Sequence, residues 1–309
     1  MKLDIKDIES LTGFNDTEIR LYCSSRLSNN LSYHIVKGRE RQCLIDKIKR
    51  DNDANTFPLR SREAFNNSYM NYYVNFLKTR NIEILMQNEP KLSIIPFRTP
   101  KIYLRFRGEY IVPESRNFEN HLRGIIRACL YHKYISTFEN IYEVGCGYGV
   151  NLIHFAQMSH NQHRLIGIDF ASACTDILNL LRVSYPINAH GMTRDITESL
   201  DIILLPNSAV VTFAALEQVG ELFDKFIDFI LDQRPAICIN REPVYELYPD
   251  TEMGELARHH SDAQGYLRGY WPRLLQLESE GAIEIIAAQR VDFGGLYHDA
   301  YNYIVWKPY

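Results

Sequence analysis

The residues of this chain whose type and spacing are most informative are one acidic residue and three glycines. Glu143 closes an apolar run that begins at Ile141, and Gly145, Gly147 and Gly149 follow it at every second position. This order predicts a strand, a tight turn and the start of a helix, because glycine adopts backbone angles that other residues avoid. The turn would bring the backbone close to a ligand, and the free N–H groups at the helix start would favour polar or anionic ligand atoms.

The spacing of the glycines separates this turn from two common nucleotide-binding motifs. The dinucleotide motif G-x-G-x-x-G requires a third glycine where this chain has Val150. The sequence G-x-x-x-x-G-K-[ST] does not occur, so a phosphate-binding P-loop is not expected. Glu143 would repel a pyrophosphate, and it would suit a ligand with a positive charge near the turn.

The stretch from Ile141 to Asn151 resembles the first motif of the class I S-adenosyl-L-methionine (SAM)-dependent methyltransferases. The resemblance covers roughly residues 131–309 in the order of elements, whereas residues 1–130 carry no family resemblance. It implies SAM as the cofactor, with the glycine turn under the methionine part and Glu143 supporting the site. It also implies a small molecule as the methyl acceptor.

Acidic residues after the next two strands fit the remainder of such a cofactor. Asp169 ends the second strand, where a carboxylate can accept both hydroxyls of a ribose; a helix cap is the alternative role. Phe170 beside it would pack on the adenine. By the resemblance, Asp195 would accept the adenine amino group, with Asp201 as a weaker competitor and a surface acid or helix cap as the alternative. Met192 would contact the adenine ring.

Three further carboxylates follow the fourth and fifth strands, and they are candidate catalytic residues. Glu217 comes after the fourth strand, and Glu242 and Glu246 come after the fifth. Acids near one cleft repel each other unless a cation lies among them, which favours a nitrogen of a cationic amine or guanidine as the acceptor. They would hold the acceptor, orient its lone pair and take the proton that it loses. The alternative is that they face solvent or pair with Arg241 or Arg258.

His298 is the fourth candidate catalytic residue, in a loop that faces the cleft in the methyltransferase family. A general base at this position would serve a hydroxyl acceptor, which makes O-methylation of a small metabolite the alternative reaction. A histidine on a surface turn is the alternative role for the residue itself. A SAM-binding module without catalysis is a third interpretation of the same motifs.

Charge and motifs argue against nucleic acid as the substrate. The formal net charge of −4 gives no general attraction to nucleic acid. The tetrapeptide Asn/Asp-Pro-Pro-Tyr/Phe, which is familiar from amine and base methylation, is missing. The basic run from Arg98 to Arg107, with Lys101 and Arg105, keeps nucleic-acid methylation open as a weaker alternative.

Cysteine usage and hydropathy predict where the chain resides. Six cysteines are scattered without a C-x-x-C pair, which favours a reducing, cytoplasmic setting and no metal site. The first residues carry no signal peptide, and no apolar run approaches about 18 residues. We therefore expect no membrane span.

The elements that must position these residues follow a regular order. From Asn140 onward, strand and helix patterns alternate, which is typical of a parallel sheet covered on both faces. We expect an α/β fold: a Rossmann-like, seven-stranded, mostly parallel sheet with an antiparallel C-terminal hairpin, joined by a turn at 293–295. Ligands of such sheets bind at the carboxyl ends of the strands. The expected strands are 141–144, 164–169, 187–190, 209–213, 236–239, 282–289 and 300–306, and the helices are 150–159, 172–183, 218–231 and 262–280.

Length favours an appended region before this domain. With 309 residues, we expect a mainly helical N-terminal region, 1–130, and a SAM-binding domain, 131–309. The predicted helix 61–78 carries aromatic residues near helical spacing. Its aromatic face either packs on the rest of the protein or forms a lid over a substrate pocket. The N-terminal region is also the candidate interface of a homodimer, because of its aromatic content.

Overall fold

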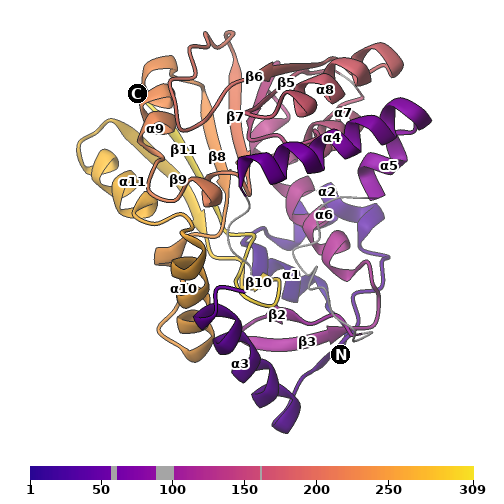
Figure 1. The fold of residues 1–309 in the computed structure, drawn as a ribbon, viewed down its shortest axis with the longest axis vertical. Coiled ribbons are helices and arrows are strands. Elements are labelled where there is room, and N and C mark those ends of the chain that lie inside the picture. Colours follow the sequence, from indigo (N-terminus) through magenta and orange to yellow (C-terminus); the bar gives the residue numbers. More distant parts are fainter. Residues whose placement is uncertain (57–60, 88–100, 161) are drawn as a thin grey trace.

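The centre of the structure, a computed structural model that describes residues 1–56, 61–87, 101–160 and 162–309, is a seven-stranded sheet. The strands stand in the order β6-β5-β4-β7-β8-β11-β9 (Figure 1). Neighbouring strands from β6 to β8 pair in parallel, whereas β11 runs antiparallel to both β8 and β9. This arrangement confirms the predicted Rossmann-like sheet with its antiparallel hairpin. The bounds are β4 Asn140–Val144, β5 Arg164–Asp169, β6 Ala189–Thr193, β7 Ser208–Phe213, β8 Ile237–Arg241, β9 Ile283–Gln289 and β11 Tyr303–Pro308.

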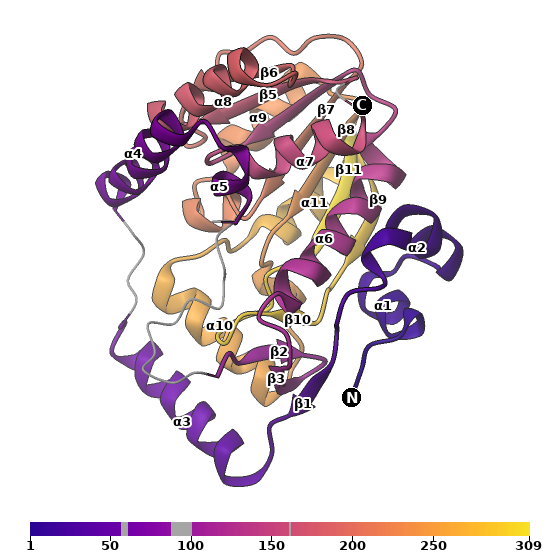
Figure 2. The ribbon, with the colours of Figure 1, turned by 90° about the vertical axis from the view of Figure 1, so that its right-hand side faces the viewer.

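Helices cover both faces of this sheet, because successive strand residues send their side chains to opposite sides. Ile141 and Val211 belong to an apolar cluster with α6, α7 and α8, whereas Tyr142 and Val210 belong to a second cluster with α9 and α11. Figure 2 shows α6 and α7 in front of the sheet. The bounds are α6 Phe118–Leu130, α7 Val150–Met158, α8 Ser172–Ser184, α9 Asp224–Gln233 and α11 Tyr270–Ser279.

Within the described residues, the first part of the chain contributes helices α1 to α5 and most of a second, four-stranded sheet. That sheet has the order β1-β3-β2-β10, and it lies with α3 and α10 at the lower end of both views (Figures 1 and 2). The first apolar cluster also includes side chains from both sides of position 130, so the two parts of the chain share a core. A separate N-terminal domain stays a prediction. The bounds are α1 Ile5–Thr12, α2 Asp16–Cys23, α3 Gly38–Asp53, α4 Arg62–Thr79, α5 Ile82–Gln87, β1 Tyr33–Ile35, β2 Leu104–Phe106, β3 Glu109–Pro113 and β10 Phe293–Gly294.

Two predicted connections were wrong. The segment Phe293-Gly294-Gly295 is not the hairpin turn, because Phe293 and Gly294 form β10 and pair with β2. The predicted helix 262–280 is two helices, α10 (Glu252–Gln264) and α11. Gly265 and Gly269 lie between these two helices and have φ values of 64° and 84°. Glycine adopts such angles at little cost, and they interrupt a helix. Pro272 lies in the first turn of α11, where a missing N–H is tolerated.

Single helical turns complete the path of the chain between these elements. A π-helical turn follows α6 directly, so the chain stays helical from residue 118 to residue 135. A 3₁₀ turn occupies the start of the predicted helix 218–231, and α9 begins only after it. The bounds are η1 Ser24–Arg26, η2 Tyr131–Ile135, η3 Leu216–Val219 and η4 Tyr245–Leu247.

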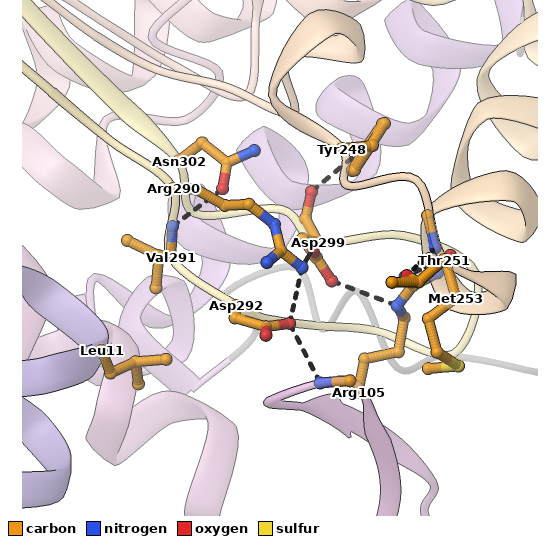
Figure 3. A network of polar contacts seen from close by, with 12 residues as sticks. Leu11, Arg105, Tyr248, Thr251, Met253, Arg290, Val291, Asp292, Asp299 and Asn302 are labelled. Carbon is orange, nitrogen blue, oxygen red and sulfur yellow. Dashed lines mark hydrogen bonds and ion pairs between the residues drawn. The ribbon is translucent and has the colours of Figure 1, made fainter.

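A buried network of ion pairs joins β2 to the segment between β9 and β11 (Figure 3). Arg105 on β2 pairs with Asp299 at 3.1 Å, and both residues are almost fully buried. Asp299 also pairs with Arg290 at 2.8 Å, and Arg290 pairs with Asp292 at 2.7 Å. The Arg105 guanidinium donates further hydrogen bonds to the carbonyls of Tyr297 and Met253. The network therefore fixes a long connection of the C-terminal hairpin against the N-terminal part of the chain.

Cysteine state and helix hydropathy agree with the sequence. All six cysteines are unbridged. Within the described ranges, no helix combines the length and the apolar character needed to cross a membrane.

Candidate functional site

The turn after β4 is a run of left-handed glycines, as the sequence predicted. Gly145, Gly147 and Gly149 have φ values of 73°, 51° and 81°. A Cβ on Gly145 would lie 2.2 Å from the Cβ of Ala215, in the loop after β7, so the close approach of these loops requires glycine. Helix α7 begins directly after Gly149. The carboxyl end of the central strand therefore carries both the glycine turn, which has no side chains at three positions, and the start of α7.

Asp169 ends β5 and ties the glycine turn to the neighbouring strand. Its Oδ2 accepts the N–H of Gly147 at 2.9 Å, and its Oδ1 accepts the N–H of Ala171 at 3.0 Å. Burial raises the pKa of this carboxyl, and the two backbone N–H groups oppose the rise. Asp169 therefore joins the glycine turn to Ala171, the residue before α8, without supplying a side-chain cap to that helix, and it also lines the cavity beside the turn.

A cavity of about 380 Å³ opens at the carboxyl ends of the parallel strands. This volume is within the usual range of small-molecule and cofactor sites, and open parallel sheets bind ligands at this edge. The loops after β4, β5, β6 and β7 all contribute to its wall. Four of the predicted cofactor residues line it: Gly145, Asp169, Phe170 and Asp195.

Three other predicted cofactor residues do not line this cavity. Gly147 faces the ring of Tyr69, whose nearest atom would lie 3.5 Å from a Cβ at that glycine. Gly149 faces Leu178 on α8 at a closer distance, so it serves the packing of α8 on the turn. Met192 packs against the apolar cluster with α9 and α11 instead of lining the cavity. Its predicted contact with an adenine ring has no support in this arrangement.

Glu143 is also absent from the cavity wall, and its surroundings differ from those of a typical surface carboxylate. The residue is fully buried, and its Oε1 accepts a hydrogen bond of 2.6 Å from the Asn151 amide of α7. Burial raises its pKa to about 8, although Asn151, Arg241 and Arg127 favour the ionised form. Near neutral pH the group is therefore largely protonated. Its visible role is to join β4 to the first turn of α7.

Asp195, predicted to bind the adenine amino group, lines the cavity but is already engaged. Its Oδ1 accepts hydrogen bonds from the backbone N–H and the hydroxyl of Thr197, at 2.9 and 2.7 Å. Its Oδ2 forms an ion pair with Arg62 of α4. Burial raises the pKa of Asp195, but the Thr197 and Arg62 contacts outweigh burial and the net shift is downward. The carboxylate is therefore ionised at neutral pH.

Helix α4 supplies a wall of the cavity that the sequence did not assign to the cofactor. Arg62, Phe65 and Tyr69 line it, whereas Phe76 is buried and stacks on Tyr185. One turn of the helix therefore packs on the rest of the protein and another lines the cavity, and a lid over a substrate pocket stays a prediction. The aromatic spacing in 61–78 was the available signal, but it did not indicate which surface the helix covers.

The three candidate catalytic carboxylates do not form one cluster. Glu242 accepts the N–H groups of Ala215 and Glu217, both at 3.1 Å, so it holds the loop after β7. Glu246 accepts the N–H of Gly269 at 2.6 Å. Two of the three acids are therefore bonded to the backbone, and only Glu217 and Glu242 influence each other's charge.

Glu217 is buried beside Glu242 and is not the solvent-exposed acid of the alternative interpretation. It is 5% exposed, and its Oε2 has no hydrogen-bond partner among the described residues. Burial and the Glu242 carboxylate raise its pKa to about 8, and Arg241 opposes the rise. The proposed pairing with Arg258 does not occur, because the Arg258 guanidinium pairs with Asp250 at 3.2 Å.

His298 is buried, so the alternative of a histidine on a surface turn was wrong. Its ring stacks on His260 with centroids 5.2 Å apart, and the edge of Tyr266 lies 5.7 Å away. Neither ring nitrogen has a hydrogen-bond partner among the residues that the structure describes. Burial and Arg105 lower its pKa to about 3, which leaves the ring neutral. His298 does not line the cavity.

The basic run that kept nucleic-acid methylation open is paired with acids where the structure describes it. Arg98 lies outside the described residues. Lys101, Arg105 and Arg107 each form an ion pair at 2.7–3.1 Å. Their partners are Glu40, Asp299 and Asp7, respectively. Arg105 is buried and cannot contact a phosphate backbone. In the described part of the chain, no group of three or more His, Cys, Asp or Glu side chains is arranged to hold a metal ion.

Comparisons with known proteins find similar solved structures at low sequence identity. No protein-family model and no curated protein match the chain. A SAM-dependent methyltransferase from Aquifex aeolicus is 12% identical over 55% of this chain and 82% of its own, with a TM-score of 0.38. Geranyl diphosphate C-methyltransferase from Streptomyces coelicolor A3(2) is 11% identical over 64% and 87%, with a TM-score of 0.43. The [4+2]-cyclase SpnF is 12% identical over 67% and 86%, with a TM-score of 0.46. At these identities and TM-scores the likeness carries no argument, and function must be argued from the cavity.

Proposed function

We propose that this chain is an enzyme that binds SAM and transfers its methyl group to a small molecule. The observation that carries the proposal is the cavity at the carboxyl ends of the parallel strands, where Gly145 and Asp169 share one wall. Gly145 allows the loops after β4 and β7 to meet at this wall, because a Cβ there would lie 2.2 Å from the Cβ of Ala215. This combination suits a ligand that needs close backbone contact at one end and a hydroxyl acceptor at the other.

The side chains of the cavity have separate tasks in this proposal. Asp169 accepts the backbone N–H groups of Gly147 and Ala171, and Phe170 and Cys174 also donate to it, so a ribose hydroxyl would bind beside these donors. Phe170 offers an apolar face to the adenine, and Asp195 offers its carboxylate to the amino group. When bound, SAM supplies an activated methyl group on a sulfonium. The protein then has to align the acceptor with that methyl group and exclude water.

Replacing Gly145 by alanine tests the fit of the turn. The new Cβ would meet Ala215, so the loop after β7 must move into the cavity. We expect Gly145→Ala to bind S-adenosylhomocysteine (SAH) about tenfold more weakly in a calorimetric titration. Gly281→Ala is the matched control: its φ is also 73°, and no atom lies within 4 Å of its new Cβ.

Both variants carry the same backbone strain, so a difference between their SAH affinities reports the contact of the new Cβ with Ala215. No heat of SAH binding to the unmodified chain would refute the proposed cofactor. Equal affinities in the two variants, with binding intact, would refute the assigned role of the turn.

Glu217 supports a nitrogen of a cationic amine or guanidine as the acceptor. Both oxygens of Glu242 accept backbone N–H groups, whereas Glu217 and Glu246 each keep one oxygen without a hydrogen-bond partner among the described residues. Glu217 is the candidate nearer to the cavity, because it directly precedes Gln218 of the cavity wall, although Glu217 itself is not part of that wall. A neighbouring cation would favour its ionised form, which could then accept the proton that the nitrogen loses. Methyl transfer to amines should therefore increase as the pH rises through about 8, where the pKa of Glu217 lies.

We expect Glu217→Gln to lower turnover of amine acceptors about tenfold and to remove this pH dependence, while SAH affinity is unchanged. A panel of amines, guanidines and hydroxylated metabolites, assayed from pH 6 to 9, gives the measurement. Unchanged amine turnover in the variant would contradict the role of Glu217.

A small hydroxylated metabolite is the second candidate acceptor, and His298 favours it. The ring is neutral and buried, and both nitrogens lack hydrogen-bond partners among the described residues, so a lone pair is available for a hydroxyl proton. Its pKa of about 3 makes it a weak base, and it lies outside the cavity wall. Turnover confined to hydroxylated acceptors would select this alternative. SAH binding without turnover on the whole panel would instead indicate a non-catalytic SAM-binding module. A homodimer through the N-terminal region and a cytoplasmic location remain predictions.

A further inference from the structure

Three side chains of α4 face the nucleoside end of the cavity. Arg62, Phe65 and Tyr69 stand at helical spacing, so they project from one side of the helix. Each contacts a different part of the opposite wall: Arg62 reaches Asp195, Phe65 meets the Phe170 ring edge-on at 6.3 Å, and Tyr69 covers Gly147. This helix therefore closes the cavity with residues from the region that carries no family resemblance.

Arg62 makes the most extensive of these contacts. Its guanidinium pairs with Asp195 and donates a hydrogen bond of 3.1 Å to the Thr197 hydroxyl. Its Cζ lies 5.6 Å from the centre of the Phe170 ring. The planar guanidinium of Arg62 therefore contacts both residues that are proposed to bind the adenine, Asp195 and Phe170. The Arg62 side chain is 61% exposed, so it borders both the cavity and solvent.

The two halves of α4 rest on different surfaces. In the second half, Phe76 is fully buried and stacks on Tyr185 near the end of α8. In the first half, Arg62 and Phe65 contact the cavity wall, Tyr69 also meets the Tyr148 ring at 6.3 Å, and the Ser61 hydroxyl caps the helix by accepting the N–H of Ala64 at 3.2 Å. The first turn, which carries Arg62 and Phe65, is therefore held in place largely by residues that a ligand would touch.

We propose that Arg62 is a cosubstrate-binding residue that positions Asp195 for an aminopurine nucleoside, and that nucleoside binding and the order of the first half of α4 are coupled. This inference rests on the proposed function. One oxygen of Asp195 is held by Thr197, so the other oxygen is shared between Arg62 and the amino group of the base. The Arg62 guanidinium lies over the Phe170 ring, and there it would also cover the edge of the base.

The test uses the full chain with SAH as the probe. We expect Arg62→Ala to weaken SAH binding about fivefold to tenfold, through the lost ion pair and the lost guanidinium–ring contact. Arg62→Lys should recover part of the affinity, because it keeps the charge without the fork. In a double-mutant cycle, Arg62→Ala should cost less when Asp195 is already Asn. Amide exchange in residues 62–70 should slow when SAH binds.

Arg80→Ala is the control on the same helix, since Arg80 contacts Ser184 and lies away from the cavity wall. It should leave SAH affinity unchanged. A structural role for Arg62 alone would lower the thermal midpoint and the apparent kcat while the KM for SAM stays constant. We expect a higher KM for SAM at constant kcat and an unchanged midpoint.

Two negative results have different meanings. Absence of SAH binding to the unmodified chain would overturn the proposed function and this inference with it. Normal binding to the unmodified chain, combined with equal affinity in Arg62→Ala, would overturn the inference alone. Additive effects of Arg62→Ala and Asp195→Asn would also overturn it, because the two residues would then act independently.

Discussion

The Asp169→Asn variant is expected to bind SAH about 100-fold more weakly than the unmodified chain. Asp169 accepts the N–H groups of Gly147 and Ala171, one on each oxygen. In the variant, an amide nitrogen must face one of these N–H groups, so one hydrogen bond is replaced by the contact of two donors. The substitution therefore removes a ribose acceptor and disturbs the glycine turn with it.

Calorimetric titration with SAH measures this effect, together with a thermal midpoint for each variant. Asp176→Asn is the matched control, because Asp176 carries the same functional group on the exposed face of the next helix, α8. We expect the control to bind like the unmodified chain. A loss of less than about threefold in folded Asp169→Asn would mean that the carboxylate serves only to join the glycine turn to Ala171.

Local patterns were sufficient for the central sheet and for half of the cofactor site. Alternation of apolar strands with helical segments predicted the order of elements from Asn140 onward. Glu143 and the three glycines mark the end of one parallel strand, and Asp169 marks the end of its neighbour. Because the carboxyl ends of adjacent parallel strands meet at one edge, local spacing alone brings Gly145 and Asp169 to the same cavity.

Contacts between distant segments explain what the sequence did not predict. Glu242 was taken for a ligand-binding acid, but its oxygens accept backbone N–H groups of Ala215 and Glu217, which precede it by about one strand–helix unit. The pair Gly294-Gly295 gave a strong turn signal, yet Gly294 lies in β10, where a Cβ would clash with the backbone near His298. Neither partner could be identified from the residues nearby.

Burial gave the charged residues properties that their sequence positions do not indicate. Glu143 and Glu217 look like ionised acids next to strands, but both are buried and the pKa of each is raised to about 8. His298 looks like a loop residue, although β10 holds its loop inside the protein. The wall supplied by α4 depends in the same way on where a helix from another part of the chain packs.

The largest effect on stability is expected for Asp299→Ala. Asp299 is fully buried and pairs with both Arg105 and Arg290 (Figure 3). Without it, the Arg105 guanidinium stays buried with only carbonyl partners, at Tyr297 and Met253. A buried charge that loses its counter-ion costs about 3–5 kcal/mol, so we expect the free energy of unfolding to fall by that amount in urea denaturation.

Asp250→Ala is the control for this substitution, because it removes an exposed carboxylate from its pair with Arg258. It should cost less than about 1 kcal/mol. Combining Asp299→Ala with Arg105→Leu should cost less than the sum of the single changes, since no unpaired guanidinium of Arg105 is left in the core. Additive costs would mean that the two residues stabilise the fold separately. Non-additive costs would identify this ion pair as the link that docks the loop carrying His298 onto β2.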